Sequence, residues 1–191
     1  MKRLVYAGAR KIDTGFEIDY TYNYPNDIID IVEPQLYDTI HNNNVYHFGY
    51  RFNDDVDSND RTKFIHVIKQ IGDTKLTDDQ LDQFIKRPLK YLNNKINLYN
   101  IDCMVYPLSN RSPLVAKIVR AINDMTSHEM HRCSFEFVES DNSFSKLRGN
   151  NILVVDNNDI NTAGSTIHEI LRKLGKINNN CNIYVFTLIG K

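Results

Sequence analysis

Apolar runs of strand length alternate with stretches of helical period in the C-terminal half of the chain. This alternation favours an α/β fold built on a parallel sheet. The run Ile152–Val155 is continuously apolar, which is typical of a central parallel strand covered on both faces. Three more strands are predicted in this half, over Ile101–Tyr106, Cys133–Val138 and Ile183–Leu188.

The first predicted helix of this half begins after Thr77. Thr77 and Gln80 stand at the spacing of a capping box, in which each side chain binds the backbone N–H of the other. Apolar residues then recur at helical spacing from Leu81 to Ile96, which gives the helix one apolar face. Pro88 lies inside this stretch and is expected to kink or split the helix, because it has no backbone N–H to donate.

Two further helices are predicted after the strands. One begins at Pro113, a residue that suits a first helical turn, and its apolar stripe extends to Met125. The other covers Ile167–Leu174 and is expected to end at Gly175, since glycine favours the position just after a helix.

The N-terminal part of the chain is less regular. Three strands are plausible there, over Leu4–Ala7, Phe16–Tyr22 and Val45–Phe52, and Asp27–Tyr37 reads as a short helix. We therefore divide the chain into an N-terminal α+β portion, residues 1–75, and an α/β core, residues 76–191.

The composition of the 191 residues is that of an ordinary globular protein, with 41% hydrophobic and 25% charged residues. The 23 basic and 24 acidic residues leave a net charge of -1, which gives no general attraction to nucleic acid or to an anionic membrane. The three cysteines, Cys103, Cys133 and Cys181, are an odd number and widely spread, as in a reducing compartment. The chain start lacks a signal-peptide core, and no run reaches the roughly 18 apolar residues of a membrane span. We expect a cytoplasmic protein with no membrane partner.

The polar loop between Val155 and Ile167 has residue types that suit a phosphate. It follows a central strand, where open α/β sheets bind ligands, and it leads directly into a helix N-terminus, which favours an anion. Thr162, Gly164 and Ser165 supply hydroxyl donors and a tightly turning backbone. A capped turn that binds no ligand would explain these residues about equally well.

The segment Asn158–Thr166, preceded by Ile152–Val155, resembles the phosphoribosyl-pyrophosphate (PRPP) motif of type I phosphoribosyltransferases. That motif has four apolar residues, two acids, a few variable residues and then Thr-Gly-x-Thr. The resemblance extends over residues 95–191 and is specific only at this loop. It implies a phosphoribosyltransferase-like parallel core with the N-terminal portion acting as a hood.

The resemblance implies a role for each residue of the loop. Asp159 would be the second acid, which binds the ribose hydroxyls and is the one protein residue that would contact a Mg²⁺ ion. Asn158 stands where the family has its first acid. In another register Asp156 is the first acid and the loop is two residues longer; we prefer the pair Asn158–Asp159 because its distance to Gly164 equals that of the family. The residues that would cradle the 5′-phosphate are Asn161, Thr162, Ala163, Gly164, Ser165 and Thr166.

Two other loops correspond in position to parts of the family's site. The pyrophosphate would bind the loop after Ile101–Tyr106, which contains Leu108, Ser109, Asn110 and Arg111. Arg111 would stabilise the charge that develops on the leaving pyrophosphate, although a solvated loop arginine is an equally good reading. Lys146 and Arg148 lie where the family has a flexible loop that closes over the site, and there too exposed cations without a role are common.

The implied reaction transfers a phosphoribosyl group from Mg²⁺-bound PRPP to a nitrogen nucleophile of nucleobase type, with release of pyrophosphate. Magnesium would take most of its ligands from PRPP and water. The acceptor is not identified by the sequence, and a homodimer is an expectation because dimers are common in the family. Asn158 keeps a second reading open, a non-catalytic module of the same fold that binds PRPP or a nucleotide in a regulatory or scaffolding role. A third reading is a flavodoxin-like protein without PRPP chemistry.

Two other segments carry weaker indications of a metal site. Asp55–Asn59 begins like a calcium loop, but Asp60 and His66 stand where glycine and glutamate are needed, so a solvated acidic turn is favoured. His128 and His131 lie close to Cys133 but lack a further pair at ligand spacing, which favours a polar helix end.

Overall fold

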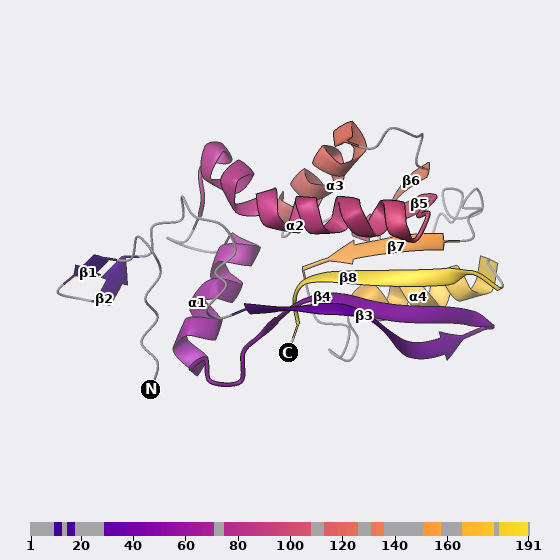
Figure 1. Cartoon of the computed structure of the whole chain (residues 1–191), viewed down its shortest axis with the longest axis horizontal. Coiled ribbons are helices and arrows are strands. Elements are labelled where there is room, and N and C mark those ends of the chain that lie inside the picture. The colour runs from indigo at the N-terminus through magenta and orange to yellow at the C-terminus, as the bar shows by residue number, and fades with distance from the viewer. Residues whose placement is uncertain are drawn as a thin grey trace.

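The computed structural model describes residues 10–12, 15–17, 29–70, 75–107, 113–125, 131–135, 151–157, 166–177 and 180–190. Figure 1 shows the elements in place. The strands are β1 (Arg10–Ile12), β2 (Gly15–Glu17), β3 (Ile29–Ile40), β4 (Asn43–Phe52), β5 (Cys103–Pro107), β6 (His131–Phe135), β7 (Asn151–Asp156) and β8 (Asn182–Gly190). The helices are α1 (Ser58–Lys69), α2 (Asp78–Leu98), α3 (Pro113–Met125) and α4 (Thr166–Ile177).

Six strands form one sheet in the order β3-β4-β8-β7-β5-β6. Every neighbouring pair is parallel except the hairpin of β3 and β4. Helices cover both faces, with α1, α2 and α3 on one and α4 on the other. The predicted α/β class with a largely parallel sheet is confirmed. β1 and β2 form a separate antiparallel pair.

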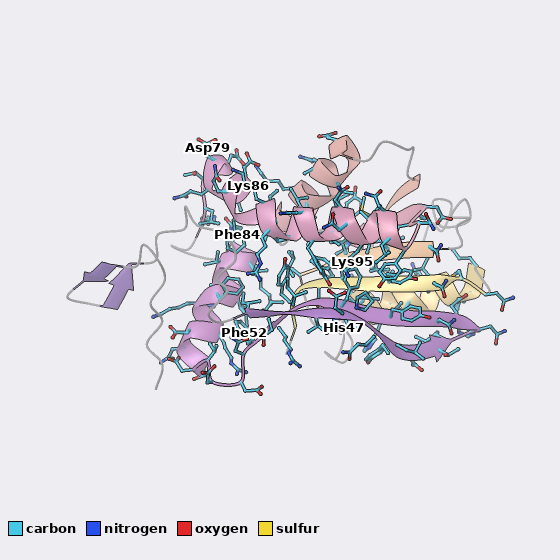
Figure 2. The ribbon with its side chains drawn as sticks, viewed as in Figure 1. His47, Phe52, Asp79, Phe84, Lys86 and Lys95 are labelled. Carbon is cyan, nitrogen blue, oxygen red and sulfur yellow. The ribbon has the colours of Figure 1, made fainter. Side chains whose placement is uncertain are left out.

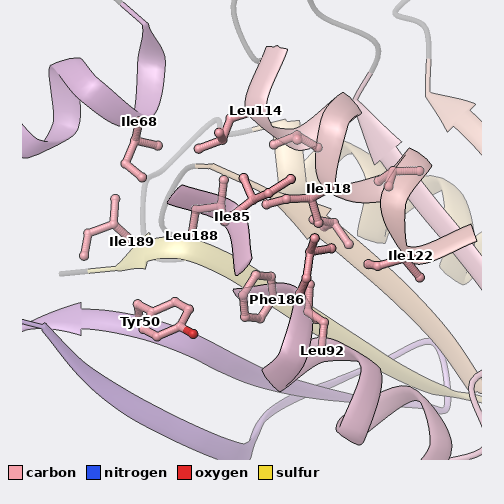
Figure 3. Packing of buried hydrophobic residues seen from close by; sticks show 14 of the residues in the cluster. Tyr50, Ile68, Ile85, Leu92, Leu114, Ile118, Ile122, Phe186, Leu188 and Ile189 are labelled. Carbon is pink, nitrogen blue, oxygen red and sulfur yellow. The ribbon is translucent and has the colours of Figure 1, made fainter. Parts of the chain in front are cut away.

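The two faces of the sheet carry two apolar clusters. On the face of α1, α2 and α3, Phe186 is fully buried and its ring centre lies 5.2 Å from that of Phe48 and 6.0 Å from that of Tyr50. Figure 3 shows side chains from three helices converging on these rings. On the other face α4 packs on alternate residues of β5, β7 and β8, among them the buried Cys103, and on the buried Cys181 just before β8. The alternation assigns each strand residue to one face or the other.

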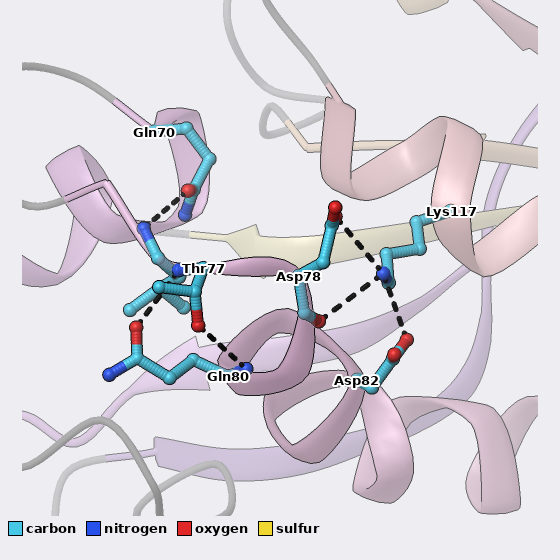
Figure 4. A network of polar contacts seen from close by, with 7 residues as sticks. Gln70, Thr77, Asp78, Gln80, Asp82 and Lys117 are labelled. Carbon is cyan, nitrogen blue, oxygen red and sulfur yellow. Dashed lines mark hydrogen bonds and ion pairs between the residues drawn. The ribbon is translucent and has the colours of Figure 1, made fainter.

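The capping box predicted before α2 is present. The Thr77 hydroxyl accepts a hydrogen bond from the Gln80 N–H at 3.3 Å, and the Gln80 side chain accepts one from the Thr77 N–H at 2.9 Å (Figure 4). Pro88 lies inside the helix and α2 runs on to Leu98, so the helix is not split there, whereas the alternative of a kink stays a prediction. Pro88 has no backbone N–H to donate to the helix. Burial of Pro88 and of Phe84, Leu89 and Leu92 on the same apolar face stabilises the helix in spite of this missing hydrogen bond.

The predicted short helix at Asp27–Tyr37 is wrong, because residues 29–40 form strand β3. The segment pairs with β4 along its length, and the turn between them uses His41 and Asn42 at positive φ. Pro34 fits this edge strand, since it lies at a shift in the register between Val32 and Gln35. Pairing with the next strand, β4, therefore decides the conformation.

Helix α1 was not predicted, because its first residues were read as an acidic turn. Asp57 is the N-cap of α1, and its carboxylate accepts hydrogen bonds from the backbone N–H groups of Asn59 and Asp60 at 2.8 and 3.0 Å. The acidic run is thus the start of a helix, a position where aspartate is strongly preferred.

Gly175 does not end α4, which continues to Ile177, so that part of the prediction is also wrong. A Cβ added at Gly175 would lie 2.5 Å from Cδ2 of His41. Glycine here permits close packing of the helix on the β3–β4 turn.

Strands β3 and β4 come from the expected N-terminal portion, yet they extend the sheet of the core through the pairing of β4 with β8. The border at residue 75 and the role of the N-terminal portion as a hood stay predictions. None of the helices described is long and apolar enough to cross a membrane.

Candidate ligand site at the carboxyl ends of the strands

The sheet has a topological switch point between β5 and β7. These strands are parallel neighbours, with Val105 paired to Val154. The chain leaves β5 toward α3 on one face and leaves β7 toward α4 on the other. Such a divergence opens a crevice at the carboxyl ends of the two strands, the usual ligand site of open α/β sheets. Both loops chosen from the sequence as phosphate sites follow these two strands.

The structure describes the borders of the two loops. The loop after β5 lies between Pro107, which is buried, and Pro113, the first residue of α3; the loop after β7 lies between Asn157 and Thr166, the first residue of α4. Thr166 is the one residue of the predicted phosphate cradle that is described, and it opens a helix with Glu169 in its first turn. The predicted site residues that lie outside the described residues are Leu108, Ser109, Asn110, Arg111, Lys146, Arg148, Asn158, Asp159, Asn161, Thr162, Ala163, Gly164 and Ser165.

Asp156 is the last residue of β7 and is only 1% exposed. Its Oδ1 accepts a hydrogen bond from the N–H of Asn157 at 2.6 Å, and Asn157 is itself buried. A buried carboxylate is expensive unless hydrogen bonds compensate for the lost water. Asp156 therefore fixes the backbone at the point where the chain leaves the sheet and enters the predicted PRPP loop.

The carboxyl ends of β8 and β4 continue this edge of the sheet on the far side of β7 from β5. Thr187 pairs with Asp156 on one side and with Gly49 on the other, and it is fully buried. The Thr187 Oγ1 lies 3.0 Å from Nε2 of His47, a half-buried residue two positions before Gly49. Alternation places His47 on the face of α4, together with Val45. Figure 2 shows the side chains of the described residues, with His47 labelled beside β4.

Gly49 allows this contact between β4 and β8. It has φ +137°, and a Cβ there would lie 2.2 Å from the carbonyl oxygen of Thr187. Only glycine tolerates both the conformation and the close approach. Because Gly49 has no side chain opposite Thr187, the imidazole of His47 reaches the threonine hydroxyl diagonally across the two strands.

Helix α3, which follows the predicted pyrophosphate loop, is tied to α2 by a lysine. Lys117 Nζ lies 2.9 Å from Asp82 and 3.4 Å from Asp78 (Figure 4). The hydrogen bond to Asp82 raises the pKa of Lys117 above its ordinary value. This pair of contacts holds the first turns of α3 against the start of α2.

Sequence reasoning did not single out Thr187, and it read the aromatic stretch Tyr46–Phe52, which contains His47, as a half-buried strand rather than the lining of a base pocket. The contact between His47 and Thr187, which lie 140 residues apart, is not marked by any local pattern. Asp156 was considered but not preferred, although its place directly after the apolar run marks it as the residue at the strand end.

The described residues contain no group of three or more His, Cys, Asp or Glu side chains that could hold a metal ion. This finding concerns only a metal site whose ligands are all protein side chains. A Mg²⁺ ion bound mainly by pyrophosphate oxygens and water needs at most one protein carboxylate, and Asp159, the residue chosen for it from the sequence, lies outside the described residues.

No protein-family model and no curated protein matches the chain. Among solved structures, a purine phosphoribosyltransferase from Pyrococcus horikoshii is similar, at 13% sequence identity and a TM-score of 0.36. The match covers 61% of this chain and 83% of that chain. This likeness is a weak one at the level of the fold, and it carries no argument about activity.

Proposed function

We propose that the chain is a type I phosphoribosyltransferase-like enzyme, which transfers phosphoribosyl from Mg²⁺-bound PRPP to a nitrogen nucleophile of nucleobase type. One observation carries the proposal: the PRPP-like segment Asn158–Thr166 starts directly beyond β7 at the switch point and ends in the first residue of α4. A phosphate in this loop would meet the N-terminus of α4, whose unpaired N–H groups favour an anion.

Strand order alone supports both this proposal and the flavodoxin-like reading. The parallel strands β6-β5-β7-β8 have the second-first-third-fourth order of that fold as well. The residues of the loop favour PRPP, because Gly164 and Thr166 match the Gly-x-Thr of the family's phosphate cradle and Asp159 matches its ribose-binding acid.

In the proposed reaction the bond between the anomeric carbon and the pyrophosphate oxygen breaks, and pyrophosphate keeps the electron pair. A bond from the acceptor nitrogen to the anomeric carbon forms, and the nitrogen loses its proton to water. The transition state resembles an oxocarbenium ion, as in glycoside cleavage. Asp159 would orient the ribose hydroxyls, Arg111 would stabilise the leaving pyrophosphate, and Mg²⁺ would neutralise part of its charge.

A second function is supported by Asn158, which replaces the first acid of the motif. With one carboxylate fewer, the loop would hold the ribose and its Mg²⁺ less firmly. The second candidate is therefore a module that binds PRPP or a nucleotide without turnover and acts on a partner protein.

Calorimetry with PRPP tests the proposal, with and without Mg²⁺, on the wild type and on Asp159→Ala. The matched control is Asp124→Ala, since Asp124 is exposed near the end of α3 that leads back to the amino ends of the strands. We expect binding that requires Asp159 and is unchanged in the control. Pyrophosphate release with a panel of nucleobases then separates the enzyme from the binding module. Absence of PRPP binding by the wild type would overturn the enzyme, and absence of both PRPP and nucleotide binding would overturn the binding module as well.

A further inference from the structure

We infer that strand β3 is a hinged strap that joins α2 and α4 around the open edge of the sheet. Its two halves, Ile29–Val32 and Gln35–Ile40, are held by helices on opposite faces, and the hinge lies between them at Glu33 and Pro34. Each half opens without the other. This inference goes beyond the proposed function and does not depend on it.

The hinge interrupts the pairing of β3 with β4. β3 is the outermost strand of the six-stranded sheet. The register shifts between Val32 and Gln35, so Glu33 and Pro34 together face one residue of β4, Phe48. Such a bulge bends a strand and disrupts its ladder locally, and proline has no N–H to donate. The hydrogen bonds of one half of β3 are therefore separated from those of the other half.

Helix α2 holds the first half of β3 at its hinge end. Lys95 forms an ion pair with the Glu33 carboxylate, and the Tyr91 hydroxyl lies 3.3 Å from the Val32 carbonyl oxygen and 3.4 Å from the Glu33 carboxylate. Only 14% of the Lys95 side chain is exposed, and its ammonium lies 5.2 Å from the centre of the Tyr91 ring. Burial raises the pKa of Tyr91, and the Glu33 carboxylate adds to this effect, so the hydroxyl stays a hydrogen-bond donor. Helix α2 thus supplies polar contacts where the ladder with β4 is disrupted.

Helix α4 holds the other end of β3 from the opposite face of the sheet. His41 directly follows β3, and its imidazole packs so closely on Gly175 of α4 that a Cβ there would lie 2.5 Å from Cδ2 of the ring. A second register shift, between Leu36 and Asp38, lies within this half of β3 and contains no proline. The two halves are therefore fastened to different helices, at points on either side of the hinge.

These two fastenings predict that the halves open independently. Opening of the first half breaks the contacts of Glu33 with α2, whereas opening of the second half breaks the contact of His41 with α4. Because the bulge already separates the two ladders, neither opening needs to break the hydrogen bonds of the other half. The strap therefore lets the helices on the two faces shift relative to each other without unpairing the whole of β3.

Native-state hydrogen exchange of the full chain tests the inference. The amides of residues 29–32 report on the first half, those of residues 35–40 on the second half, and those of residues 152–155 in β7 on global unfolding. In Glu33→Gln the first half should exchange about fivefold faster, the factor for a partly exposed ion pair of about 1 kcal/mol, and the second half should keep its rate. In His41→Ala the second half should exchange faster and the first half should keep its rate.

Asp30→Asn is the matched control, because it removes an acid from the same half of β3 at an exposed position that takes no part in the Glu33 contacts. It should leave the exchange rates of both halves unchanged. Lys95→Gln should repeat the effect of Glu33→Gln, whereas Lys95→Arg keeps the charge and should keep rates near those of wild type. The rates in β7, measured in the same samples, separate a general loss of stability from opening of β3.

The inference is overturned if Glu33→Gln or His41→Ala accelerates both halves of β3 alike, because the strand then opens as one unit. It is overturned as well if either variant accelerates neither half, because the contact removed then does not hold the strand. Hydrogen exchange is measured without PRPP, so failure of the proposed function leaves this test unchanged.

Discussion

Gly175 of α4 lies directly against the imidazole of His41 in the turn between β3 and β4. A Cβ added at Gly175 would lie only 2.5 Å from Cδ2 of the ring, which is too close for a side chain at this position. This contact joins the C-terminal part of the core to the N-terminal hairpin.

The contact predicts coupling between the two positions. In an otherwise wild-type chain, Gly175→Ala gains helix propensity of about 1 kcal/mol but displaces His41. In a His41→Ala background the displacement is absent and the gain remains. We expect the two substitutions to differ from additivity by about 1 kcal/mol in the free energy of unfolding, measured by urea denaturation. Additive effects would contradict the contact.

The aromatic cluster around Phe186 predicts a large loss of stability on truncation. Phe186 is fully buried among the rings of Phe48, Tyr50 and Tyr91. Phe186→Ala should cost about 3–5 kcal/mol in the free energy of unfolding, and Phe186→Leu distinctly less. Urea denaturation measures both. Equal and small losses of stability in the two variants would mean that the Phe186 ring is not enclosed by the other rings.

Lys117 predicts a dependence of stability on alkaline pH. Its folded-state pKa is raised by Asp82 above the ordinary value of 10.5, so its stabilising effect is complete below pH 10.5 and is lost as the pH rises through the folded-state pKa. Lys117→Gln should lower stability by under about 1 kcal/mol at neutral pH, because Asp78 and Asp82 are exposed to solvent although Lys117 is half-buried. The difference from wild type should shrink above pH 10.5. Lys90→Gln, an exposed change on α2, is the control and should show no such trend.

Substitutions of Asp156 and Asp159 should have different effects: changes at Asp156 should lower stability, and changes at Asp159 should lower the affinity for PRPP. Asp156→Ala removes the acceptor of the buried Asn157 N–H and should cost about 1–3 kcal/mol in stability, whereas Asp156→Asn keeps an oxygen and should cost less. Asp159→Ala should leave stability near that of wild type and weaken PRPP binding. Thermal denaturation and calorimetry on the same samples measure both properties. Loss of PRPP affinity in the stable Asp156→Asn variant alone would favour the register in which Asp156 is the first acid.

The sequence predicted the parts of the fold that depend on local pattern. The apolar runs at β5, β7 and β8 and the stripes of α2, α3 and α4 follow from periodicity, and the PRPP-like loop is contiguous in the chain. β3 was predicted as a helix because its conformation depends on pairing with β4 and not on its own residues. Helix α1 was missed because the acidic residues around Asp57 resemble a turn until their hydrogen bonds to the helix start are seen.

The candidate site also has a part that could be predicted from the sequence and a part that could not. Its loops could be chosen from residue types, since hydroxyls, glycine and a helix start are neighbours in sequence. The pairing of His47 with Thr187 depends on β4 joining β8, a contact between distant segments that no spacing indicates.

Binding of PRPP to the wild type by calorimetry, in the presence and absence of Mg²⁺, tests the central claim most directly. We predict saturable binding that is strengthened by Mg²⁺ and lost in Asp159→Ala. No heat of binding and no rise in melting temperature with PRPP, from a chain that unfolds cooperatively, would contradict the claim and leave an α/β fold whose switch point serves another ligand.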